Sequence, residues 1–303
     1  MKYLYLLLFC LIFSISGSAQ QLPQFTQYMY NTISINPAYA GSRDGFSITA
    51  LNRNQWAGVS GAPNTQTLSI HSPLTNDKVG LGLSVINDKT GYENYTYAYG
   101  DFAYRLDFSN DISLAMGLKA GMSYYNLDRE LFTDQQVLND PFFEDRFNKW
   151  TPNFGIGFYL SSQKWYVGAS APKLINNNNH EYSEFLAMEQ IHYYLTGGYV
   201  FDLNENLKFR PTSLLKMTSG APLSVDFSGT MIFNEKFYLG ANWRIDDALG
   251  AFLDVELFDG FRAGYAYEYS ISDIRPYTSG SHEILLIYEF RFQKTRYKSP
   301  RFF

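Results

Sequence analysis

The chain has almost no cysteine. Its single cysteine, Cys10, lies in an apolar run, Tyr3–Ile15, that follows the charged Lys2 and precedes the small residues Ser16–Ala19. These are the three parts of a secretory signal peptide, with cleavage expected after Ala19, so that residues 1–19 are removed. The apolar run is too short for a retained membrane helix. The mature chain then has no cysteine, which excludes disulfides and thiolate chemistry.

Long hydrophobic runs are also missing. After Ala19 no apolar stretch approaches the roughly 18 residues that a membrane helix needs. This excludes a helical membrane protein. The net charge of −5 argues against a nucleic-acid partner.

Signals for catalysis are scarce as well. The four histidines share no motif, and nothing has the spacing of a zinc site. Ser281 and His282 are adjacent, but neighbouring strand residues face opposite ways, so His282 cannot activate Ser281 directly. We therefore expect no enzymatic activity, no cofactor and no metal.

Aromatic residues and glycine are abundant, with 25 Tyr, 25 Phe and 23 Gly. This is the profile of an all-β protein with aromatic girdles. Many segments alternate strictly between apolar and small or polar residues, as 111–125 and 222–233 do. Because successive strand residues point to opposite faces, each segment has one apolar and one polar face.

The alternating segments are long and even in number. We count about fourteen, at 45–53, 65–72, 78–87, 95–107, 111–125, 151–161, 163–171, 192–203, 206–217, 222–233, 236–245, 248–258, 260–270 and 281–292. Most reach the length that a tilted transmembrane strand requires. Short and longer connections alternate between them, with 88–94 among the longer ones. Periplasmic turns and external loops of outer-membrane proteins differ in this way. The sequence predicts a transmembrane antiparallel β-barrel of about 14 strands over residues 45–292, embedded in the outer-membrane lipid bilayer.

Residues 24–42 do not alternate. Their first part has the spacing of one short helical face, and Asn36-Pro37 imposes an extended or turn conformation. Small residues around Tyr39 allow close approach to another surface. We expect residues 20–44 to form an N-terminal arm, and we propose that it plugs the periplasmic mouth with Asn36, Pro37 and Tyr39. An ordinary terminal arm is the alternative.

Blocks throughout the mature chain carry a resemblance. They are SINPAYAGS at 34–42, RNQW at 53–56, APNT at 62–65, GLGLSVIND at 80–88, SAPKL at 170–174, HYYLTGGYVF at 192–201, PTSLLK at 211–216, APLSVD at 221–226, GYAYEYS at 264–270, SHEILLIYEF at 281–290 and SPRFF at 299–303. Together they resemble the PorP/SprF family of the type IX secretion system in Bacteroidetes. That resemblance implies a barrel that supports secretion and surface attachment of cargo, including gliding adhesins in some lineages. Its implied partners are type B C-terminal domains of cargo and the periplasmic and outer-membrane secretion machinery.

Charges of both signs fall on the inward face by strand parity. They are Asp101, Arg105, Asp107, Lys119, Arg210, Asp226, Arg244, Asp254, Glu256, Arg262, Glu268, Glu283, Glu289 and Arg291. Balanced acids and bases on neighbouring strands favour a paired network in a filled interior. A porin-like channel for small solutes is the alternative function.

Two long external loops, 126–150 and 172–191, are rich in apolar residues among acids. The partner-binding candidates in them are Phe142, Phe143, Trp150, Phe185 and Met188. Loops in water carry this much apolar area when it is buried against the barrel or a partner. A cargo site and a self-packed lid are both consistent with the pattern.

The last segment, residues 293–303, carries four basic residues after the final strand. We expect it to be either a docking segment in the periplasm or a disordered basic tail.

Overall fold

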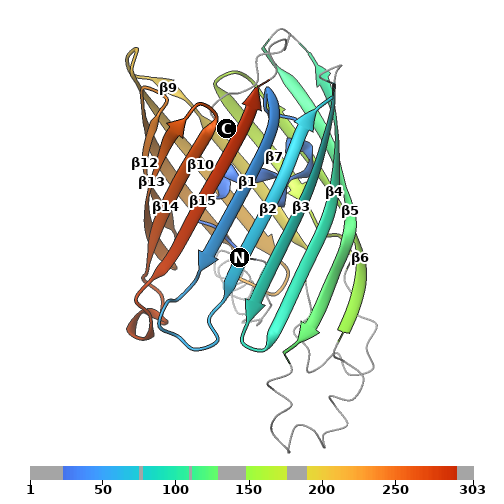
Figure 1. The fold of residues 1–303 in the computed structure, drawn as a ribbon, viewed down its shortest axis with the longest axis vertical. Coiled ribbons are helices and arrows are strands. Elements are labelled where there is room, and N and C mark those ends of the chain that lie inside the picture. The colour runs from blue at the N-terminus through green and yellow to red at the C-terminus, as the bar shows by residue number, and fades with distance from the viewer. Residues whose placement is uncertain (1–22, 75–77, 109–110, 129–147, 176–189, 292–303) are drawn as a thin grey trace, which may run out of the picture.

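The computed structural model describes residues 23–74, 78–108, 111–128, 148–175 and 190–291. Its strands form one antiparallel sheet in which each strand pairs with the next along the chain, except that β8 and the two-residue β9 both pair with β10. The last strand, β15 (Ser281–Arg291), returns to pair with the first, β1 (Gly45–Asn54). This pairing closes the sheet into a barrel, with β1 beginning at the expected residue (Figure 1).

The other strands follow in hairpin order. They are β2 (Asn64–Pro73), β3 (Val79–Thr90), β4 (Glu93–Asp107), β5 (Ser113–Leu127), β6 (Asn148–Ser161), β7 (Trp165–Ala171), β8 (His192–Tyr199), β9 (Phe201–Asp202), β10 (Leu207–Thr218), β11 (Ser224–Phe233), β12 (Phe237–Arg244), β13 (Ala248–Phe258) and β14 (Phe261–Ser270). β8 and β9 both pair with β10 and lie end to end along it. The break between them lies beside Pro211 of β10, which has no N–H to donate to the ladder. Counting β8 and β9 as one, the described residues form fourteen strands, which confirms the predicted barrel.

The strand faces alternate as the sequence predicts. Along β12 exposed and buried residues alternate without exception. Phe237, Leu239 and Trp243 are exposed on its outward face, as expected for a surface that meets lipid. The barrel satisfies its backbone hydrogen bonds between strands, which is the condition for residing in a bilayer.

The two ends of the barrel differ in their connections. One end carries tight turns such as Asn234-Glu235, where both residues have left-handed φ values of 52° and 57°. The other carries longer segments such as 55–63 and 271–280, the latter containing the helical turn η4 (Arg275–Tyr277). Since outer-membrane barrels have short periplasmic turns and longer external loops, we call these the periplasmic end and the outer end.

One expected outer loop is much shorter than predicted. The connection placed at residues 88–94 consists of only Gly91 and Tyr92, because β3 continues to Thr90 and β4 begins at Glu93. Gly91 supplies the left-handed φ of 58° that this tight turn requires. The alternation of loop length is therefore less strict than the sequence pattern indicates.

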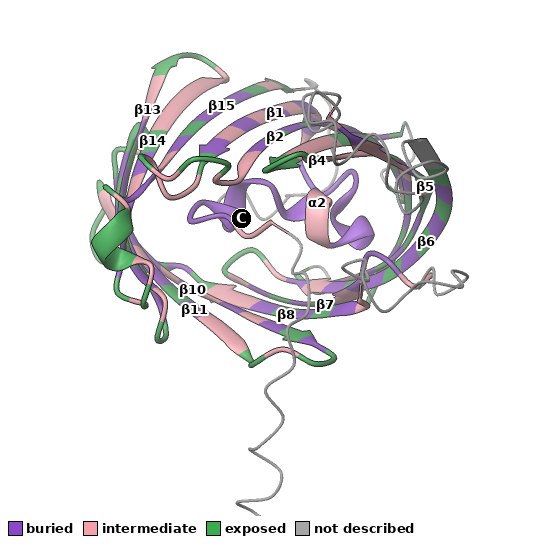
Figure 2. Ribbon diagram, turned by 90° about the horizontal axis from the view of Figure 1, so that it is seen from below, coloured by how far each residue is buried: buried purple, intermediate pink, exposed green. Residues whose placement is uncertain are grey.

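The arm before β1 lies inside the barrel (Figure 2). It contains the short helical turns η1 (Tyr28–Tyr30), α2 (Thr32–Ile35) and η2 (Pro37–Tyr39). Among the described residues, two hydrophobic clusters combine arm residues with inward residues of the barrel wall. The core of this protein is therefore the filled lumen.

Within the described residues, no helix has the length and apolarity of a membrane span.

Candidate functional site: the arm and the outer vestibule

The first residues of the arm are bonded to carboxylates of the barrel wall. The Thr26 backbone N–H donates to Glu283 at 2.7 Å, and the Thr26 hydroxyl donates to Glu268 at 2.8 Å. The Gln27 side-chain amide donates to Asp254 at 2.7 Å. Polar arm groups thus replace the water that would otherwise solvate these buried acids.

Two of these acids, Glu268 and Glu283, are also paired with arginines of the wall. Arg53 lies 2.5 Å from Glu268 and 2.6 Å from Glu283. Arg244 lies 3.0 Å from Asp226 and 3.3 Å from Glu268. All five side chains are almost completely buried. The network therefore runs from β11 to β1 across neighbouring strands, and it confirms the predicted pairing of luminal charge.

A second pair, Lys119 and Asp101, lies deeper in the lumen at 2.8 Å. Lys119 also donates to the Ile33 carbonyl of the arm at 3.3 Å. Among the predicted inward charges, Asp107 is exposed, because it is the last residue of β4 at the barrel rim; its cross-strand partner Ser113 is buried, so the two share the inward face. Arg53 was not among the predicted inward charges, although the alternation of β1 places it there.

The middle of the arm sits in what we call the glycine slot, made by Gly80, Gly117 and Gly157. A Cβ atom at these positions would lie 2.0 Å from the Ala40 carbonyl oxygen, 2.1 Å from the Ala38 nitrogen and 2.1 Å from the Asn36 side-chain oxygen, respectively. Only glycine permits this approach of arm and wall.

Asn36, Pro37 and Tyr39 lie together against this slot. The Asn36 side chain donates to the Phe158 carbonyl at 3.0 Å and accepts from the Ala38 N–H at 3.0 Å. The Tyr39 ring meets His71 and Tyr159 edge-on at centroid distances of 5.3 and 5.5 Å. The structure therefore brings the three proposed plug residues together.

The path of the arm differs from the one expected. Arg43 lies 3.5 Å from Glu289 at the periplasmic end, but Gln24 contacts Ser224 and Asp226 near the outer end. The arm thus crosses the lumen instead of plugging only the periplasmic mouth. Residues 23–42 carry no charged side chain, so their burial requires only hydrogen bonds and apolar contacts.

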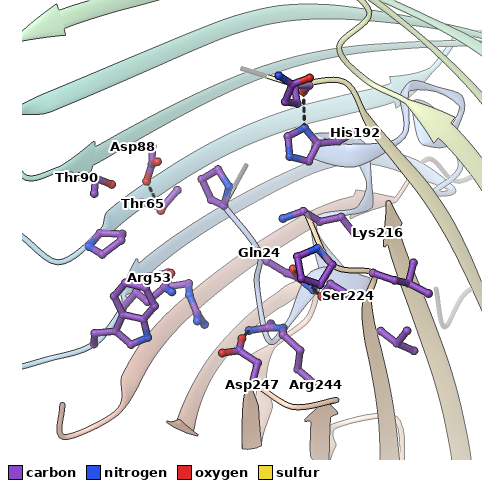
Figure 3. Close-up of a pocket in the computed structure, with 18 of the residues that line it drawn as sticks. Gln24, Arg53, Thr65, Asp88, Thr90, His192, Lys216, Ser224, Arg244 and Asp247 are labelled. Atoms are coloured by element: carbon purple, nitrogen blue, oxygen red, sulfur yellow. Dashed lines mark hydrogen bonds and ion pairs between the residues drawn. The ribbon is translucent and has the colours of Figure 1, made fainter. Parts of the chain in front are cut away.

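Above the arm, the outer end opens into a cavity of about 640 Å³, the outer vestibule. Pro23 and Gln24 line it together with strand-end residues that include Trp56, His192 and Lys216 (Figure 3). All of these wall residues lie at or next to the outer ends of strands.

Lys173 lies in the wall of the outer vestibule, just beyond the end of β7. Burial lowers the pKa of Lys173 to about 7. Its ammonium nitrogen lies 5.3 Å from the centre of the Tyr97 ring, within range of a cation–π interaction. The charge of this wall therefore responds to pH near neutrality.

Comparison with known proteins places the chain in a family. Residues 17–288 match the family model described as type IX secretion system membrane protein PorP/SprF. The chain belongs to this family. It is a PorP/SprF protein of the outer membrane, as its resemblance and its barrel predict. Among curated proteins nothing matches.

Several solved barrels are similar to this PorP/SprF chain. The CymD monoaromatic hydrocarbon channel is 10% identical with a TM-score of 0.49, covering 90% of this chain and 95% of its own. The Acinetobacter baumannii outer membrane protein Omp33 is 9% identical with a TM-score of 0.47, covering 82% and 100%. The KdgM porin is 10% identical with a TM-score of 0.38, covering 81% and 99%. All three TM-scores are below 0.5, so the fold rests on the strand pairing described above.

The proposed partner-binding residues of this PorP/SprF chain are only partly in view. Trp150 is not in a loop: it belongs to β6, is 61% exposed on the outward face and packs on Tyr124 at 4.7 Å. The predicted loop is too long, because β6 begins at Asn148 and not at residue 151, where its alternating pattern starts. Phe142, Phe143, Phe185 and Met188 lie outside the described residues, as does the tail at 293–303.

The described histidines occupy separate structural positions. His71 accepts from the Gly41 N–H at 3.3 Å, His192 is bonded to the Gln190 carbonyl at 2.8 Å, and His282 to the Tyr265 hydroxyl at 2.6 Å. The part of the chain that the structure describes contains no cluster of potential metal ligands.

Proposed function

We propose that this PorP/SprF protein is a non-enzymatic anchoring barrel of the type IX secretion system. It holds secreted cargo with type B C-terminal domains, such as adhesins, at the cell surface and contacts the secretion machinery on its periplasmic side. The observation that carries the proposal is the filled lumen. A barrel whose interior is occupied by its own chain offers its two ends, rather than a pore, for function.

The contacts of the arm support this role over diffusion of solutes. A general porin keeps a wet lumen with a constriction lined by charge. Here the acids and bases pair across the wall, and Phe25, Tyr28, Met29 and Tyr30 are buried among inward strand residues. Conductance of the refolded protein in planar bilayers separates the two functions: the anchoring barrel conducts near zero, whereas the porin-like alternative conducts in the intact state.

The cargo site is proposed at the outer end, on the connections 128–147 and 172–191. The aromatic residues of these loops have the character of binding anchors. Each loop joins two neighbouring strands, with only β6 and β7 between them, so both leave the barrel on the same side.

The test replaces Phe142, Phe143 and Phe185 with serine and follows the adhesin in cells and medium. Attachment through these loops predicts release of the adhesin while the barrel remains heat-modifiable on gels. The matched control is Tyr277→Ser, which removes a 73% exposed aromatic ring from another outer loop and leaves attachment unchanged. Continued attachment with a folded triple variant places the cargo elsewhere, and an unfolded barrel shows that the loops are part of the core.

A further inference from the structure

The direction of the arm has a consequence for the topology of the protein. The first strand, β1, starts at the periplasmic end, where Gly41 packs against Gly80 at the start of β3. Twenty residues earlier the chain is at the opposite end, where Pro23 and Gln24 line the outer vestibule. The arm therefore passes through the whole barrel before the first strand begins.

The two ends of the arm contact opposite ends of the wall. Gln24 bonds to Ser224, which begins β11 at the outer end, and Arg105 donates to the Gly41 carbonyl at 2.9 Å near the periplasmic end. Between them the arm folds back once, since Ser34 and Ile35 line one small cavity with Pro23 and Phe25. The start and the end of the arm nevertheless stay at opposite ends of the barrel.

We propose that the mature chain enters its own barrel from the cell-surface side, so that its N-terminus faces the outside of the cell. A partner at the cell surface then meets the start of the mature chain, with its free α-amino group, as part of the outer end.

Chain length supports the assignment. With cleavage after Ala19, three residues precede Pro23 and span at most about 10 Å when extended. The ten residues of β1 alone correspond to about 33 Å of strand. Three residues cannot return through a lumen that residues 24–43 already occupy, so the N-terminus stays at the outer end.

The experiment inserts a short epitope tag between Gln21 and Leu22 and probes it with antibody on intact and permeabilised cells. A matched insertion after Ser60, in an exposed outer loop, is the control for surface access. An insertion after Asn204, in the exposed periplasmic turn, is the control for concealment. We expect the tag at Gln21 to behave like the tag at Ser60, with full binding before permeabilisation. Binding only after permeabilisation overturns the inference.

A second variant covers the case in which the tag prevents folding. The mature chain lacks cysteine, so Leu22→Cys can be labelled alone with a membrane-impermeant maleimide, beside Ser60→Cys and Glu205→Cys. Labelling in intact cells supports presentation at the surface. Labelling only in permeabilised cells, or only after denaturation, overturns it. If N-terminal sequencing finds the leader still attached, more than three residues precede Pro23, and the inference is likewise overturned. None of these measurements involves cargo, so the inference is tested separately from the anchoring function.

Discussion

Replacing Gly117 by alanine would place a methyl carbon 2.1 Å from the Ala38 nitrogen and 2.4 Å from the Pro37 carbonyl carbon. Both neighbours are backbone atoms, so no side chain can rotate away. Extending the contact from 2.1 Å to an ordinary 3.4 Å requires arm and wall to separate by about 1.3 Å. A shift of that size would break the 3.0 Å bond from Asn36 to the Phe158 carbonyl.

The energetic consequence can be set against a matched substitution. Overpacking of a close contact costs about 1–3 kcal/mol, whereas Gly→Ala at a compatible site gains about 0.4–1 kcal/mol through the unfolded chain. Gly100, in β4, is such a site, because the nearest atom to its added Cβ is 3.8 Å away. Both variants share this gain, so Gly117→Ala should be less stable than Gly100→Ala by about 1–3 kcal/mol, which shifts the seating of the arm at least about fivefold.

Two assays read this difference. Urea titration followed by heat-modifiability reports the free energy of unfolding, and planar-bilayer recording reports leakage past a displaced arm. We expect Gly117→Ala to unfold at lower urea and to conduct intermittently, and Gly100→Ala to unfold at slightly higher urea than the natural chain and to conduct as the natural chain does. If the two variants are indistinguishable, the glycine slot does not hold the arm and the reasoning is refuted.

Four further predictions concern the arm, the ion pairs, the vestibule and the tail. Deleting residues 21–40 should raise conductance from near zero, and an intact chain that already conducts like a porin contradicts a filled lumen. Arg53→Met should lower the free energy of unfolding by about 3–5 kcal/mol, because Glu268 and Glu283 lose their shared cation. The stability of Arg53→Lys should lie between those of Arg53→Met and the natural chain. Equal urea midpoints for all three would argue against the network. Because the pKa of Lys173 falls to about 7 on folding, the folded chain binds fewer protons than the unfolded one above that pH. The free energy of unfolding of the natural chain, relative to that of Lys173→Met, should therefore rise from about pH 7 to pH 10 and be constant below pH 7. Urea midpoints of the two chains across this range test the prediction. A difference between them that does not change with pH contradicts the burial of Lys173. Truncation after Phe292 should leave membrane insertion intact while secretion falls; lost insertion would instead identify the tail as an assembly signal.

Most of the barrel could be predicted because its information is local. Alternation along β12 identifies which side chains meet lipid, since strand geometry fixes the face of every second residue. The same parity predicted the burial of Asp226, Arg244 and Glu268. It did not show that Asp107 is open to solvent at the end of its strand, and it missed Trp150, whose strand begins earlier than its pattern reveals.

The arm shows where local information ends. Its sequence indicated a segment that is not a strand, with small residues suited to close packing. The partners of that packing, Gly80, Gly117 and Gly157, lie on three strands that become neighbours of the arm only when the barrel closes. No local periodicity specifies such contacts, so the predicted plug had the correct residues and an incomplete path.

By itself, the amino-acid sequence determined a closed β-barrel with an apolar exterior, a charged interior and a PorP/SprF pattern. Strand parity, strand length and turn chemistry are properties of short segments, and each can be assessed before the chain folds. Only the tertiary structure decided that the arm crosses the lumen and that Pro23 lies at the outer end. Those features depend on contacts between residues more than a hundred positions apart, such as Thr26 with Glu268 and Glu283, which exist only once the sheet has closed around the arm.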